Sequence, residues 1–302
     1  MMRGATAMAV AVRRPDGSIE ARSERLGGIL TSPLRHVPFL RGVMVLFETL
    51  GLGMRALSWS AAVASNQVDS RGEARALTVF DWLVLLGAFS VGAGMFFVGP
   101  VLATAWLDAL LPAPWMALAI EGVLRLALLV GYIWAMGRAK DIRRVFQYHG
   151  AEHMTIYAHE EGRELNVPAI RRYPKEHPRC GTSFLLTVAL VAMVVFAFVG
   201  TEPLWWRLSS RIILVPVVAA VSYEVIRFAG FHQDWPVVRW LFAGNLALQK
   251  LTTRAPDDEQ IQVAIAALQR VRDEERGLNS ALATVQMMNP GSARSVPGGR
   301  LK

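Results

Sequence analysis

Long, almost uninterrupted apolar stretches restrict what this chain can fold into. Residues 82–105 and 115–136 contain very few charges, and two further apolar stretches cover residues 184–200 and 212–229. A helix of about 20 apolar residues crosses a hydrocarbon core of about 30 Å, and only helices and closed barrels satisfy their own backbone there. The sequence therefore predicts an all-α polytopic membrane protein with about four transmembrane helices.

The remaining segments divide the chain further. Residues 1–30 are expected to form a β-hairpin segment, because apolar runs flank the turn Pro15-Asp16-Gly17-Ser18. The other expected units are an interfacial helix with its connector (31–76), a transmembrane bundle with a cytoplasmic metal-site loop at 138–182 (77–254), a C-terminal amphipathic helix (255–288) and a disordered tail (289–302).

The helix expected at 39–64 differs from the spans in its charges. Arg41, Glu48 and Arg55 recur at seven-residue spacing, so they share one face. Three charges within the hydrocarbon would be costly. The helix is therefore expected at the membrane surface or against the bundle.

The charges of the loops predict the orientation of the chain in the membrane. Segment 138–179 carries nine Lys and Arg residues, whereas the loop 108–114 carries none. By the positive-inside rule, both termini and the 138–182 loop are cytoplasmic in a multi-pass protein of the cell membrane. The net charge of +8 then fits a lipid bilayer as partner, and no aromatic-interleaved basic motif points to nucleic acid. The single cysteine excludes an internal disulfide and fits a reducing compartment.

The pattern H-x-x-E-H in this loop carries the clearest chemistry. On a helix, His149 and His153 lie one turn apart and can hold one Zn²⁺, with Glu152 beside them as a possible base. The alternative is a pair of interfacial histidines that cap a helix. Glu160 shares the face of the two histidines and is a secondary candidate.

Further candidate ligands lie downstream. His177 and Cys180 form an H-x-x-C pair before the third span, although Cys180 alone could be a small buried hydrophobe. Glu224 lies near the end of the fourth span, as a ligand or as an ion-pair partner of Arg227.

Two functions follow from these residues. The first is a zinc-dependent membrane hydrolase, in which Glu152 activates water against a membrane peptide or a lipid at the cytoplasmic interface. The alternative is a non-catalytic scaffold or partner-binding protein, in which His149, His153, His177 and Cys180 close a structural zinc site. An ion carrier ranks last, because the charges within the spans pair locally, as Glu121 and Arg125 do at i,i+4 spacing.

Several longer runs resemble the bacterial YqhQ family, a group of unknown function described as predicted metal-dependent enzymes. They are residues 144–153, 179–184 and 223–224, with Pro38-Phe39-Leu40-Arg41-Gly42 and Gln249-Lys250-Leu251-Thr252-Thr253. The resemblance implies a metal-dependent activity and a site built from His149, Glu152, His153, Glu160, His177, Cys180 and Glu224. Relatives usually carry a Gly-Gly-Gln-Ala-Val-Ile-Glu-Gly-Val run before Met-Met-Arg-Gly, so either the true start lies upstream of Met1 or this member lacks that loop.

Overall fold

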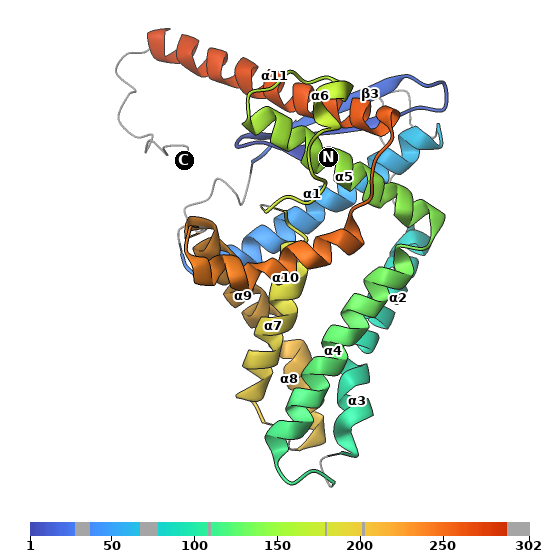
Figure 1. Ribbon diagram of the computed structural model, residues 1–302, viewed down its shortest axis with the longest axis vertical. Coiled ribbons are helices and arrows are strands. Elements are labelled where there is room, and N and C mark those ends of the chain that lie inside the picture. Colours follow the sequence, from blue (N-terminus) through green and yellow to red (C-terminus); the bar gives the residue numbers. More distant parts are fainter. Residues whose placement is uncertain are drawn as a thin grey trace.

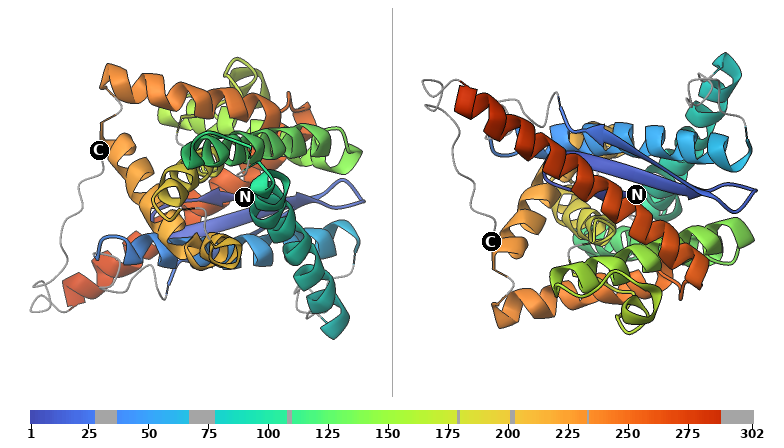
Figure 2. Two further views of the ribbon diagram at one scale, coloured as in Figure 1. Left: turned by 90° about the horizontal axis from the view of Figure 1, so that it is seen from below. Right: turned by 90° about the horizontal axis from the view of Figure 1, so that it is seen from above.

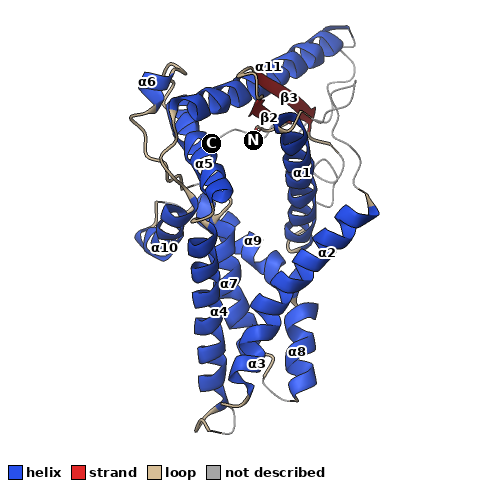
Figure 3. Ribbon diagram, turned by 90° about the vertical axis from the view of Figure 1, so that its right-hand side faces the viewer, coloured by secondary structure: helices blue, strands red, loops and turns tan. Residues whose placement is uncertain are grey.

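The computed structural model describes residues 1–27, 37–66, 78–107, 110–178, 180–200, 203–232 and 234–288. Its elements in chain order are β1 (Met2–Arg3), β2 (Ala7–Arg13), β3 (Ile19–Arg25), α1 (Leu40–Ala64), α2 (Val79–Ala93), the π-helix η3 (Gly94–Val98), α3 (Gly99–Ala105), α4 (Pro114–Met136), α5 (Lys140–Glu160), α6 (Val167–Ile170), α7 (Ser183–Ala197), α8 (Leu204–Ile213), α9 (Val215–Phe231), α10 (Pro236–Thr252) and α11 (Asp258–Met288). The sheet, α5, α6 and α11 gather at one end, and α3, α4, α7 and α8 extend away from it (Figure 1 and Figure 3).

A small antiparallel sheet forms the middle layer of that end, in the order β1-β2-β3. Helix α11 crosses one face, and α1 packs against β2 on the other (Figure 2). Ala9 belongs to the core shared with α5, α6 and α11, whereas Val10 and Val12 pack with Trp59 of α1. Both faces of β2 are therefore covered, which explains its continuous apolar sequence.

The β2–β3 turn confirms the predicted hairpin. Gly17 has a φ of 86°, in the left-handed region that favours glycine, and Ser18 N donates to Asp16 Oδ1 at 2.9 Å. The sequence did not predict the short third strand, β1, which pairs Met2 with Ala9.

Helix α11 lies within the segment 255–288, where the amphipathic helix is predicted. Asp257 and Gln260 exchange two hydrogen bonds, of 2.8 and 3.0 Å, which close its first turn as a capping box does. Its apolar face, which includes Ile261 and Val271, is buried in the core beneath the sheet. The predicted disordered tail, 289–302, lies outside the described residues.

Only part of the four-span prediction is supported. Among the described residues, two helices are long and apolar enough to cross a membrane, Val79–Ala105 and Trp115–Met136. The stretch predicted at 184–200 gives a shorter helix, α7, whose 15 residues extend about 22 Å at 1.5 Å each. The stretch predicted at 212–229 belongs to a pair, α8 and α9, bent by 50°, so the structure supports two or up to three spans.

Prolines accompany two irregularities in these helices, the bend between α8 and α9 and the π-helix η3. Pro216, at the start of α9, has no N–H to continue the hydrogen bonding of α8. Pro100 likewise cannot donate to the carbonyl of Phe96, four residues earlier, and Arg125 Nε donates to that carbonyl at 3.0 Å. The π-helix η3 precedes this proline, as expected where an i−4 bond is missing.

The predicted pair of Glu121 and Arg125 is confirmed, at 2.7 Å, and it is part of a larger cluster. Arg207 and Arg211 of α8 also donate to the Glu121 carboxylate, at 2.9 to 3.3 Å. Glu121 is 1% exposed, and Arg207 and Arg211 are fully buried. The cluster therefore joins α8 to α4 through charge-assisted hydrogen bonds in the interior.

Helix α5 is separate from the membrane-length helix α4 that precedes it. Helix α4 ends at Met136 and α5 begins at Lys140, after Ala139 takes an extended conformation. Gly162 follows the end of α5 with a φ of 65°, and Arg163 N donates to Ala158 O at 2.8 Å, as in a glycine C-cap. The break lets α5 pack against α11.

Candidate metal centre

The two histidines of H-x-x-E-H lie on one face of α5, as predicted. Their ring centroids are 4.3 Å apart. His149 Nδ1 lies 2.9 Å from the carbonyl oxygen of Thr252, and His153 Nδ1 lies 2.6 Å from that of Lys175. A carbonyl only accepts, so both Nδ1 atoms carry a proton. The Nε2 atom of each ring offers a lone pair to a metal when the imidazole is neutral, and donates a hydrogen bond when the imidazole is protonated.

The H-x-x-C segment meets these histidines because α10 holds it in place. Gln249 Oε1 accepts from His177 N at 2.9 Å, and Gln249 Nε2 donates to His177 O at 3.0 Å. Cys180 N donates to His177 O at 3.2 Å, which closes the turn. Cys180 Sγ then lies 3.1 Å from His149 Nε2.

His149, His153 and Cys180 form a group with metal-ligand geometry. Their three ligand atoms all lie within 4.8 Å of one another. Tetrahedral zinc, with Zn–N of about 2.0–2.1 Å and Zn–S of about 2.3 Å, separates its ligands by about 3.3–3.6 Å. Histidine ligands usually donate their other ring N–H to a carbonyl or carboxylate, as both do here. The donor set therefore fits zinc.

The same contacts favour the thiolate form of Cys180. Burial raises the pKa of the thiol, but hydrogen bonds from His149, His153 and Thr182 and the charge of His149 outweigh it and lower the pKa to about 5. Burial lowers the pKa of His149, but its hydrogen bond to Cys180 and the charge of that thiolate raise it overall. Since the thiolate is the form that binds metal, Cys180 is prepared to act as a ligand.

A cavity of about 480 Å³ opens over this group. It is lined by all the predicted site residues except Glu224, together with Ile156, Gly181 and Thr182. Glu152 is one-third exposed and lies 3.6 Å from the amine of Met1. His177 Nε2 lies 3.4 Å from Glu160 Oε2, so these two residues form a second polar pair in the wall of the cavity.

Glu224 is held at a different place. Its carboxylate accepts from Arg41 of α1, at 2.7 Å from Nε, and from the backbone N of Phe39 at 3.1 Å. The i,i+3 spacing offers Arg227 as its ion partner, whereas the hydrogen-bonded partner is Arg41. This pair ties α1 to α9, which pack together.

Some residues that build the site had no predicted role. Gln249 and the carbonyls of Lys175 and Thr252 orient the ligands, and Gly150 lets the chain after α10 approach α5. A Cβ on Gly150 would lie 2.3 Å from the carbonyl oxygen of Arg254. Gln249 and Thr252 fall within one of the runs that resemble the YqhQ family. That run was the sequence signal that could have pointed to these two residues.

The fold and the site define a class of protein: a helical chain with membrane-length helices and a small sheet that carries a partly buried His/Cys cluster on α5 and the H-x-x-C turn. The chain belongs to the family described as "Protein of unknown function (DUF1385)", which matches residues 37–274. It is also 33% identical, over 265 residues, to the "Uncharacterized protein YqhQ" of Bacillus subtilis (strain 168), which covers 84% of this chain and 83% of the relative. The suggested YqhQ-like membership is thus confirmed, and no solved structure matches the chain.

Proposed function

We propose that the protein is a zinc-dependent hydrolase that acts at the cytoplasmic membrane interface. The observation that carries this proposal is the convergence of His149, His153 and Cys180 within 4.8 Å. Three protein ligands leave a fourth position open, which distinguishes catalytic from structural zinc.

In this proposal, Glu152 accepts a proton from the attacking water and returns it to the leaving group. When bound, zinc supplies Lewis acidity and lowers the pKa of a coordinated water towards about 7. Glu152 lines the same cavity and takes the proton as the water oxygen bonds to the substrate carbonyl carbon. It then returns that proton to the departing amine or alkoxide as the scissile bond breaks.

The His177–Glu160 pair faces the same cavity. A histidine beside a carboxylate can donate a hydrogen bond to the oxygen that gains charge in the transition state. Zinc deaminases offer a precedent for a His and Cys ligand set with a non-ligating Glu as acid and base. A thiolate ligand is therefore compatible with hydrolysis.

The position of the site suggests a substrate at the membrane. Helix α5 follows α4, a helix of membrane length, after a three-residue break. The cavity therefore lies on the part of the chain that leaves the span. A membrane peptide or a lipid with a hydrolysable carbonyl is the class of substrate this placement favours.

The alternative is a closed structural site with His177 as the fourth ligand. His177 is buried, and its ring centroid lies 5.8 Å from that of His153. However, its Nε2 faces Glu160, so closure would require the ring to leave that carboxylate. The open arrangement is therefore preferred.

Metal content of the detergent-purified protein tests the ligand set. We expect about one zinc per chain in the parent and none in the His149→Ala/His153→Ala double variant. His159→Ala is the matched control, because His159 is exposed on the same helix and should leave the metal content unchanged. An absence of metal from the parent, purified without chelator, would contradict the proposal.

Glu152→Gln separates catalysis from structure. Incubation with membrane peptide and phospholipid libraries, followed by mass spectrometry, should show products formed by the parent. The Gln variant should keep its zinc and lose about 10²–10⁴-fold of the rate, the usual contribution of a general base. Retention of both zinc and full rate would favour the structural alternative.

A further inference from the structure

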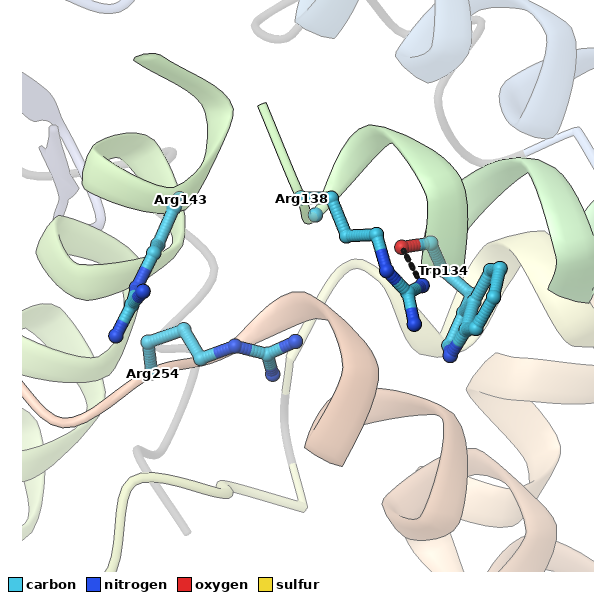
Figure 4. Close-up of a pocket in the computed structure, with 5 residues that line it drawn as sticks. Trp134, Arg138, Arg143 and Arg254 are labelled. Carbon is cyan, nitrogen blue, oxygen red and sulfur yellow. Dashed lines mark hydrogen bonds between the residues drawn. The ribbon is translucent and has the colours of Figure 1, made fainter. Parts of the chain in front are cut away.

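A second cavity, of about 320 Å³, lies at the junction of α4, α5 and the chain after α10. It is lined by Trp134, Gly137, Arg138, Arg143 and Arg254 (Figure 4). Its volume is at the lower end of the range of small-molecule sites, about 300–1,000 Å³. The polar side chains in its wall are all arginines.

Neighbouring groups orient two of these arginines. Arg138 stacks on the indole of Trp134, with its guanidinium carbon 3.1 Å from the ring centroid. Arg254 Nη1 donates to the carbonyls of Lys250 and Thr253, at 2.8 and 2.9 Å. Figure 4 shows the Arg254 side chain reaching toward Arg138, with Arg143 on its other side.

The arginines of this cavity have no ion-pair partner among the described residues. Within the described residues, no carboxylate lies within 4 Å of the guanidinium groups of Arg138, Arg143 or Arg254. Three guanidinium groups that line one cavity repel one another and favour the binding of an anion. The planar donor fork of arginine matches the geometry of phosphate.

The position of the cavity relative to the membrane indicates which phosphate-containing molecule could bind there. Trp134 is half exposed at the end of the membrane-length helix Trp115–Met136, and Arg138 follows two residues later. Tryptophan is enriched at headgroup level, and an arginine just beyond a span lies among lipid phosphates. The predicted cytoplasmic side is the leaflet that holds anionic lipids.

We propose that Arg138, Arg143, Arg254 and Trp134 form a binding site for the phosphate of an anionic phospholipid headgroup. The site is separate from the metal centre, but the two share a segment. Thr252 accepts from His149 at 2.9 Å, and Arg254 lies two residues further along. A bound headgroup would therefore fix the part of the chain that also orients a zinc ligand.

Native mass spectrometry of the purified full-length protein tests this site. Phosphatidylglycerol, phosphatidylcholine and inorganic phosphate would be titrated in separate experiments. We expect one phosphatidylglycerol to bind, at least about tenfold more tightly than phosphatidylcholine, which carries no net charge. Saturation by inorganic phosphate with no preference for the lipid would identify a soluble phosphate as the ligand and overturn the lipid assignment.

Two variants identify the residues. Arg143→Gln removes a guanidinium that makes no hydrogen bond within the described residues. It should therefore weaken the binding of phosphatidylglycerol about tenfold and leave the unfolding temperature unchanged. Arg143→Gln/Arg254→Gln should abolish specific binding. Arg172→Gln, at an exposed arginine away from the cavity, removes the same charge and should bind as the parent does. Equal binding by the parent and both cavity variants would refute the site.

Discussion

At the scale of single residues, the site depends on groups that orient the ligands as much as on the ligands. The sequence predicted His149, His153 and Cys180 because their spacing and type are typical of zinc ligands. It could not predict that backbone carbonyls of Lys175 and Thr252 accept from the two imidazoles. A backbone acceptor leaves no signature in residue type, since every residue has a carbonyl.

Gly150 shows how such an arrangement constrains a residue without reactive groups. In Gly150→Ala, the new Cβ would lie 2.3 Å from the Arg254 carbonyl oxygen, so the segment after α10 must move away from α5. We expect a loss of about 1–3 kcal/mol in the free energy of unfolding, as for other overpacked sites. Zinc content should also fall, because Thr252 moves with that segment.

Thermal unfolding and metal analysis would measure both effects. Gly131→Ala is the matched control, because Gly131 is also helical and its added Cβ would meet nothing within 4 Å. A Gly150→Ala variant as stable and as rich in zinc as the parent would contradict the close approach seen here.

Cys180 leads to a prediction about pH. In metal-free protein, the rate of alkylation by iodoacetamide should follow the thiolate fraction. This fraction rises with pH through the pKa of about 5, so alkylation should be fast at neutral pH and fall below about pH 5. An unperturbed cysteine would show its midpoint near about 8.5.

His149→Ala supplies the comparison. Removal of the imidazole that lowers the pKa should move the midpoint of alkylation upward, towards the ordinary value. Added zinc should protect the parent from alkylation. A parent midpoint at that ordinary value would show that the His149–Cys180 contact is absent in solution.

At the scale of elements, the sequence predicted what depends on local pattern and missed what depends on partners. The hairpin turn and the amphipathic α11 follow from turn chemistry and periodicity, and the structure contains both. The bend between α8 and α9 was missed, although Pro216 marks it in the sequence. The contacts of Arg207 and Arg211 with Glu121, on a helix distant in sequence, could not be predicted. A tertiary ion pair of this kind is invisible to hydropathy.

Helix α10 was also unexpected, and its Gln249 provides a test. Gln249 is 1% exposed and exchanges two hydrogen bonds with the backbone of His177. In Gln249→Leu, the buried N–H of His177 loses its acceptor, at a cost of about 1–3 kcal/mol, and the His177 carbonyl keeps only the hydrogen bond from Cys180 N. The H-x-x-C turn should loosen, so we expect weaker zinc binding together with a lower unfolding temperature.

A metal titration that follows chelator removal would measure the change in zinc affinity. Gln262→Leu is a suitable control, because Gln262 lies in α11 and its side chain accepts from Arg13, at the end of β2, away from the H-x-x-C turn. Unchanged affinity in the Gln249 variant would mean that the turn holds its shape without α10.

At the scale of the whole molecule, the ends of α3, α4 and α8 lie together, opposite the end that carries the sheet (Figure 1 and Figure 3). The charge asymmetry of the loops predicts that the sheet end is cytoplasmic. Cys180 is the only native cysteine, so its replacement by Ser gives a background for cysteine labelling.

In that background, Pro112→Cys and Phe198→Cys should react with a membrane-impermeant maleimide added outside intact cells. Ser18→Cys, in the hairpin turn, should react only after the cells are opened. Labelling of position 112 but not of position 198 would indicate that α7 and the bent α8–α9 pair enter the membrane without crossing it. Labelling of position 18 from outside would reverse the predicted orientation.

The buried carboxylate of Glu121 has a consequence for biogenesis. An arginine at the centre of an inserting helix costs about 2.5–3.5 kcal/mol, so α8, with Arg207 and Arg211, is a poor substrate for insertion on its own. Helix α4 is synthesised first and already carries the acceptor that both guanidinium groups contact. We therefore expect that α4 stays beside the insertion machinery until α8 emerges, so that the two helices enter the lipid together.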